Sequence, residues 1–167
     1  MGVSMAGDMA SEEDVVQPML PGAERWVPDV VLKFWEILGS SPMSNSSDAR
    51  AALAGVESRL RLLEPAELVA FQEQLAIQLG ALYRDDLASI PVEIKGVVYG
   101  QSDDHFLYAR CACLLAGQEA VRRVMAKPER FAKFVSPGVQ AEELMYLAGY
   151  EYKRRTGGAM QAVLLPD

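Results

Sequence analysis

The segment from Gly100 to Lys127, GQSDDHFLYARCACLLAGQEAVRRVMAK, constrains the fold of this chain more than any other. Ser102 suits an N-cap because its hydroxyl accepts from a backbone N–H further along the first turn, and Asp103 and Asp104 follow where the helix dipole favours negative charge. The residues after them are apolar almost all round, and a helix that is apolar on every side is normally buried on every side. We therefore predict an all-α, single-domain helical bundle around a central buried helix at about 102–126.

The composition fits one globular domain and disfavours nucleic acid as a partner. The chain has 167 residues, of which 50% are hydrophobic and 23% charged, and its net charge is -7. That length allows a single domain with a substantial core. An acidic balance is a poor match for a phosphate backbone, which is bound through basic patches, so we expect no nucleic-acid partner.

The cysteines, the missing motifs and the hydropathy limit the chemistry and the compartment. Cys111 and Cys113 point to different sides of a helix, so they indicate small buried side chains and not a disulfide or a metal site. The chain has no Gly-rich phosphate loop and no Gly-x-Ser-x-Gly motif, and we expect no metal and no cofactor. It has no signal-peptide pattern and no apolar run long enough to cross a bilayer. These features predict a cytoplasmic protein without membrane association.

Three regions are expected along the chain. Residues 1–27 mix Gly, Met, Ser, Pro and acidic residues without a period, which predicts a flexible arm. Residues 28–158 form the helical domain, and 159–167 form a C-terminal tail. Gly117 is expected to break or bend the central helix. Amphipathic spacing with start and stop residues predicts further helices at about 29–38, 48–63 and 65–86, one that starts at Pro128, and a last one at 139–156.

The segment 90–99, IPVEIKGVVY, is ambiguous. Its β-branched residues favour a strand on local propensity. No strand partner is evident elsewhere in the chain, and a lone strand is not stable. We therefore favour a short irregular helix after Pro91 that ends at Gly100.

Six short motifs stand in a particular order along the chain. They are Lys33-Phe34-Trp35, Leu63-Glu64-Pro65-Ala66-Glu67, Tyr83-Arg84-Asp85-Asp86-Leu87, Ser102-Asp103-Asp104-His105-Phe106, Ala116-Gly117-Gln118 and Glu142-Glu143-Leu144-Met145-Tyr146. In this order, the chain from about 33 to 157 resembles the small, mostly actinobacterial helical family called domain of unknown function 4240. Two departures mark a divergent member. The family's tryptophans near the Asp-Leu motif are absent, and the connector, where the family carries a Gly-rich run before Ser-Asp-Asp, holds Pro91 and looks longer.

The resemblance implies an all-helical fold and a cytoplasmic setting, and it implies no assigned activity. It also directs attention to the polar residues within the matching motifs. These are Asp86, Ser102, Asp103, Asp104, Glu142 and Glu143.

Carboxylates that share a partly buried cleft suit acid–base catalysis or the binding of a cation, because like charges raise the pKa of at least one of them. The candidate catalytic residues are Asp103, Asp104, His105 and Glu143. The candidate ligand-binding residues are Asp86, Ser102, Glu142 and Tyr146. The alternative is that the acids only complement helix dipoles or face solvent, and that His105 only caps or packs.

Three functions from different classes are compatible with these features, and the sequence leaves open whether the chain is an enzyme. The first is a helical accessory or regulatory protein that acts through a protein partner. The second is a small enzyme of specialised metabolism that uses Asp86, Asp103, Asp104 and Glu143 with His105. The third is a protein that binds a small cationic ligand in the same acidic site. We favour them in that order, and a homodimer is left open.

Overall fold

The computed structural model describes residues 28–136, 138–139 and 141–161. The predicted arm at 1–27 and residues 162–167 of the predicted tail lie outside the described residues. In chain order, the elements are α2 Pro28–Leu38, α3 Ser46–Leu60, α4 Pro65–Ala81, α5 Asp85–Ala88, β1 Val92–Ile94, β2 Val97–Tyr99, α6 Asp103–Ala116, α7 Gln118–Ala126, the 3-10 helices η2 Pro128–Phe134 and η3 Glu142–Met145, and α8 Leu147–Thr156.

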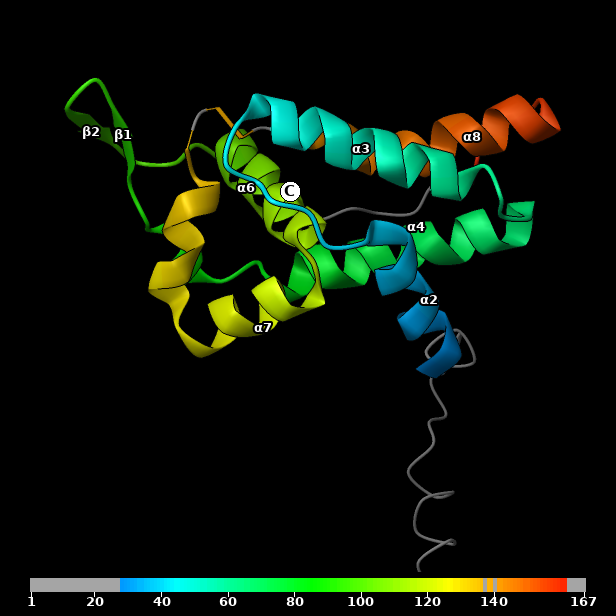
Figure 1. The fold of residues 1–167 in the computed structure, drawn as a ribbon, viewed down its shortest axis with the longest axis horizontal. Coiled ribbons are helices and arrows are strands. Elements are labelled where there is room, and N and C mark those ends of the chain that lie inside the picture. Colours follow the sequence, from blue (N-terminus) through cyan, green and yellow to red (C-terminus); the bar gives the residue numbers. More distant parts are fainter. Residues whose placement is uncertain (1–27, 137, 140, 162–167) are drawn as a thin grey trace, which may run out of the picture.

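The described residues are mostly helical, which confirms the predicted all-α, single-domain fold class. Helix α8 lies beside α3 and also packs against α4, and α2 contacts both α3 and α4 (Figure 1). Helix α6 contacts α3, α4, α7, η2 and η3. It is therefore the central helix of the part of the molecule that also contains α7, η2 and η3. No helix of the described residues is both long and apolar enough to span a bilayer.

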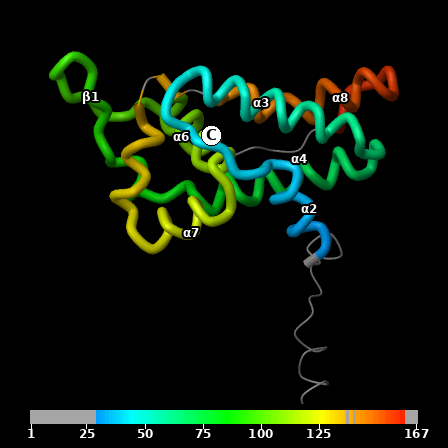
Figure 2. Tube along the Cα trace, viewed as in Figure 1, coloured from blue at the N-terminus to red at the C-terminus, as the bar shows by residue number. Residues whose placement is uncertain are grey.

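The predicted central helix is two helices. Helix α6 is the buried one, with Cys111 and Leu114 fully inaccessible to solvent, whereas α7 buries only Val121 and Val124. The break falls at Gly117, where φ is +110° and ψ is 171°. This conformation is open to glycine and strained for other residues. Figure 2 shows the change of direction of the chain between α6 and α7.

The prediction of a short irregular helix over 90–99 is wrong, because this segment forms an antiparallel hairpin. Strands β1 and β2 pair in the register Val92↔Tyr99, Glu93↔Val98 and Ile94↔Val97. The two residues between them, Lys95 and Gly96, have φ of 53° and 81°. Two consecutive positive φ values give a turn whose twist suits a two-residue hairpin. The strand partner that the prediction required lies within the segment itself.

Arginine side chains from neighbouring helices close the C-terminal ends of α2 and α4. The last carbonyls of a helix have no partner within it. Arg59 of α3 donates from Nε to the Ile37 carbonyl at 2.6 Å and from Nη2 to the Leu38 carbonyl at 3.3 Å. Arg110 of α6 donates from Nη1 to the Leu79 carbonyl of α4 at 3.0 Å. The positive charge also suits the negative end of each helix dipole.

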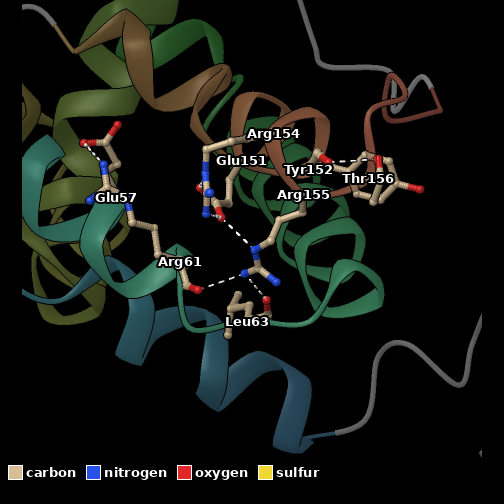
Figure 3. Close-up of polar contacts among 8 residues, drawn as sticks. All are labelled: Glu57, Arg61, Leu63, Glu151, Tyr152, Arg154, Arg155 and Thr156. Atoms are coloured by element: carbon tan, nitrogen blue, oxygen red, sulfur yellow. Dashed lines mark hydrogen bonds and ion pairs between the residues drawn. The ribbon is translucent and has the colours of Figure 1, made fainter.

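A third arginine, Arg155 of α8, closes the turn that follows α3 (Figure 3). Its guanidinium donates to the Arg61 carbonyl at 2.8 Å and to the Leu63 carbonyl. Its Nε donates at 2.8 Å to Glu151, which is 6% exposed. Hydrogen bonds from Arg154, which has the larger effect, and from Arg155 lower the pKa of Glu151. The buried carboxylate therefore stays ionised and holds Arg155 in place.

Candidate functional site

The start of α6 carries four of the candidate residues. The Ser102 hydroxyl accepts from the backbone N–H of His105 at 3.1 Å, so Ser102 is the N-cap of α6. Asp103 and Asp104 occupy the first turn and are exposed. Their charge complements the helix dipole at this position.

His105 is half-buried and its Nε2 lies 2.6 Å from the carbonyl oxygen of Val135. A carbonyl oxygen only accepts, so Nε2 carries the hydrogen in this contact. That nitrogen joins the start of α6 to the end of η2. Only Nδ1 is then left to take up a proton, which limits the histidine to one side of its ring as a base.

Tyr108 is linked to three of the candidates. Its hydroxyl donates to the carboxylate of Glu142, and Asp104 and Tyr146 act on it through charge. The hydrogen bond to Glu142, together with burial and these neighbours, raises the pKa of Tyr108 to about 12. The Tyr108 hydroxyl therefore joins α6 to Glu142 of η3, and the sequence reasoning did not single it out.

Asp86 and Glu143 lie outside this group of contacts. Asp86 receives hydrogen bonds from Arg84 Nε at 3.0 Å and Nη2 at 2.5 Å, and this pairing lowers the pKa of Asp86. Glu143 is exposed in η3. In the described part of the chain, no group of three or more His, Cys, Asp or Glu side chains is arranged to hold a metal ion. Glu142 thus shares a hydrogen bond with Tyr108, Asp104 and Tyr146 influence Tyr108 through charge, and Asp86 has Arg84 as a separate partner.

Two surface features were missed by the sequence reasoning. The first is the β1–β2 hairpin, whose signal was the Lys95-Gly96 pair between β-branched runs. The second is a groove of about 790 Å³ between residues 40–44, the first turns of α7, and η2. Its walls come from three separate segments, and no local pattern reports their proximity.

The Tyr108–Glu142 contact can be tested by titration. Replacement of Glu142 with Gln removes a carboxylate that accepts from the phenol and repels the phenolate, so we expect the pKa of Tyr108 to fall towards the value of about 10 for an ordinary tyrosine. Titration is followed by phenolate absorbance between pH 9 and 11. The chain has six tyrosines, so the difference from a Tyr108→Phe variant gives the contribution of Tyr108. Superimposable titrations of the parent and Glu142→Gln would contradict the contact.

A family model with the description "Protein of unknown function (DUF4240)" matches residues 31–154. No curated protein and no solved structure matches the chain. The match covers nearly all of the described helices, from α2 to most of α8.

Proposed function

This chain belongs to the DUF4240 family, and we propose that it is a cytoplasmic accessory protein that acts without catalysis and binds a protein partner through the β1–β2 hairpin. The observation that carries the proposal is the exposure of apolar side chains on this hairpin. Ile94, Val97, Val98 and Tyr99 are 42%, 50%, 63% and 51% exposed. Soluble monomers rarely present contiguous apolar surface of this kind without a partner.

The register places most of these side chains on one face. Residues that pair directly across a hairpin share a face, and alternate residues of a strand share it too. Val92, Ile94, Val97 and Tyr99 therefore form one apolar face, of which only Val92 at the base is buried. The hairpin stands at the edge of the molecule, away from the helices (Figure 1).

The backbone of the hairpin supports the same kind of partner. Among the described residues the sheet has only two strands, in the order β1-β2. Each strand thus has one neighbour and one open edge of N–H and C=O groups. An extended segment of another protein can pair with such an edge while its side chains contact the apolar face.

Gln101 holds the base of the hairpin. Its Nε2 lies 2.9, 3.1 and 3.0 Å from the carbonyl oxygens of Leu87, Ala88 and Ile90. These carbonyls precede the hairpin and Gln101 follows it, so the Gln101 amide links the segments at the two ends of the hairpin. A partner that binds a fixed hairpin loses less conformational entropy on binding than one that must order it.

The proposal is tested by photo-crosslinking in the source cells followed by reconstitution. A photoreactive amino acid at Val97, which lies on the apolar face, is expected to capture a partner. The same amino acid at Leu62, an apolar residue that is 82% exposed in the α3–α4 turn, is the control. The captured protein is then purified, and its affinity is measured for the parent, Val97→Lys and Leu62→Lys. We expect Val97→Lys to weaken binding at least about tenfold, because a desolvated charge is costly, and Leu62→Lys to leave binding unchanged.

Equal capture at both positions, or equal affinity of the two lysine variants, would contradict a binding role for the hairpin. Capture of a second copy of the chain would show that the partner is the protein itself and that the hairpin forms a homodimer interface. Sedimentation of the parent and of Val97→Lys would then report the dimer directly.

The second candidate function is the binding of a small cationic ligand. The observation that favours it is that Tyr146 and Tyr150, with ring centroids 6.2 Å apart, are exposed next to the Tyr108–Glu142 pair. Aromatic faces and carboxylates together attract quaternary ammonium groups. The Tyr108 titration tests this reading, because tetramethylammonium bound beside Glu142 would lower the pKa of Tyr108. The enzyme alternative, with Asp86, Asp103, Asp104, Glu143 and His105, requires these groups to act on one substrate, and the contact of Asp86 with Arg84 does not favour it.

A further inference from the structure

A groove on the α7 side of the molecule has a charge opposite to that of the protein. It has a volume of about 790 Å³, which is within the range of small-molecule sites. Its walls are the connector 40–44 after α2, the first turns of α7, and η2. None of the candidate acidic residues lines it.

Three cations line this groove. Arg123 comes from α7, and Arg130 and Lys133 come from η2. Two carboxylates, Glu119 and Glu129, also line it, so its local charge is +1 in a chain of net charge -7.

The carboxylate of Glu119 does not fully neutralise its neighbours. It is shared between Arg122 at 3.4 Å and Arg123 at 3.5 Å, and all three side chains are largely exposed. Exposed ion pairs of this length contribute little free energy. Arg123 can therefore leave Glu119 for a ligand at small cost.

The opposite wall and the floor add hydroxyl groups and apolar surface. Ser40 donates from its hydroxyl to the Ala116 carbonyl at 3.0 Å, and the hydroxyls of Ser41 and Ser44 form no hydrogen bond with any described residue. Pro42, Ala116 and Ala120 line the groove and are at least partly exposed, and Met43, Val124 and Phe134 are buried beneath them. The lining thus offers charged donors, hydroxyl donors and an apolar floor to one molecule.

We propose that this groove binds a small organic anion, with a carboxylate or phosphate head held by Arg123, Arg130 and Lys133 and an apolar portion on the floor. Guanidinium and ammonium groups form charge-assisted hydrogen bonds with either head group. The apolar portion contributes the burial that an inorganic anion lacks. The site is separate from the hairpin, so its test does not depend on a protein partner.

The test is calorimetric titration of the full chain with octanoate and with octyl phosphate, each below the concentration at which it aggregates. Octyltrimethylammonium, acetate and inorganic phosphate are the comparison probes. We expect at least one octyl anion to bind, and the stronger of the two identifies the head group. Acetate and inorganic phosphate should bind at least about tenfold more weakly, because they leave the floor uncovered. The ammonium probe should not bind in the groove, so Arg123→Gln should leave any binding of this probe at the Tyr108–Glu142 site unchanged.

Two adjacent arginines give a matched pair of variants. Arg122 and Arg123 lie on the same helix, contact the same Glu119 and are 67% and 63% exposed, but only Arg123 lines the groove. We expect Arg123→Gln to weaken binding of the octyl anion about tenfold, the usual scale for one charge-assisted hydrogen bond, and Arg122→Gln to have little effect. The parent and both variants should give the same circular dichroism spectrum.

Three results would overturn the proposal. They are the absence of binding by both octyl anions, binding of the octyl cation that Arg123→Gln weakens as much as it weakens binding of the octyl anion, and equal effects of the two arginine variants. Each of them leaves the hairpin experiment unaffected, since Val97 does not line the groove.

Discussion

Replacement of Gly117 with Ala is expected to lower the free energy of unfolding by about 3–4 kcal/mol. Two costs contribute. With φ of +110° and ψ of 171°, the backbone lies in a region that costs a non-glycine residue about 1–3 kcal/mol. A Cβ at this position would also lie 2.7 Å from Oγ and 3.1 Å from Cα of Ser40, and such overpacking costs about 1–3 kcal/mol.

The Ser40 backbone cannot easily move away from that new methyl group. Ser40 donates to Ala116, and the N–H of Ser41 donates to the Leu115 carbonyl at 3.1 Å. Any shift that relieves the clash would therefore weaken the contact between the connector and α6. Urea denaturation measures the loss, and for a chain of this length it corresponds to a fall in Tm of roughly 6–16 °C.

Gly80→Ala is the control for this experiment. Gly80 lies in α4, and an added Cβ there meets nothing within 4 Å. This substitution should therefore stabilise the protein by about 0.5–1 kcal/mol. If Gly117→Ala were as stable as the parent, the break between α6 and α7 would not depend on glycine.

Replacement of Arg110 with Ala is expected to lower the free energy of unfolding by about 3–5 kcal/mol. Arg110 is fully buried, donates to the Leu79 carbonyl, and stacks over the rings of Phe106 at 4.4 Å and Tyr83 at 4.9 Å. Alanine leaves a cavity and removes a donor from a buried carbonyl. The cavity costs about 2–3 kcal/mol by analogy with other large-to-small replacements, and the carbonyl costs about 1–3 kcal/mol.

Arg110→Met separates these two costs. Methionine keeps most of the volume and cannot donate, so we expect a loss of only about 1–3 kcal/mol. Urea denaturation of the three proteins gives both terms. Equal losses for the alanine and methionine variants would assign the whole effect to the hydrogen bonds and ring contacts, and a methionine variant as stable as the parent would mean that α4 does not need this donor.

The helical fold follows from features that sequence reports directly. All-round apolarity predicts a buried α6, and Gly117 predicts its end, because both signals are local. Arg110 was not singled out, since an arginine within an apolar run can either reach solvent or be buried, and only the neighbouring α4 decides which. The Lys95-Gly96 turn of the hairpin is a local signal. The prediction of a helix there is wrong because it assumes a partner strand elsewhere in the chain, whereas both strands lie within the segment.

The candidate site could be anticipated only in part. Helix-end acids are visible in a sequence, but their distances depend on where η3 and α5 come to lie. Tyr108 fits the apolar pattern of α6 in the sequence, although its hydroxyl donates to Glu142, which is 34 positions further along the chain. The groove on the α7 side depends on residues from three segments, and its cations read individually as ordinary helix-end charges.

The arginines that close the helix ends also govern the order in which the chain can assemble during synthesis. Arg59 lies 22 residues from Ile37, Arg110 lies 31 residues from Leu79, and Arg155 lies 94 residues from Arg61. Each donor leaves the ribosome after the carbonyl that it serves, and the donor for the turn after α3 is made near the end of the chain. Until then that turn must rely on water, and α3 and α4 both lack α8, the helix that packs against each of them. Closing so distant a contact is slow and late, which makes the growing chain dependent on its last helix.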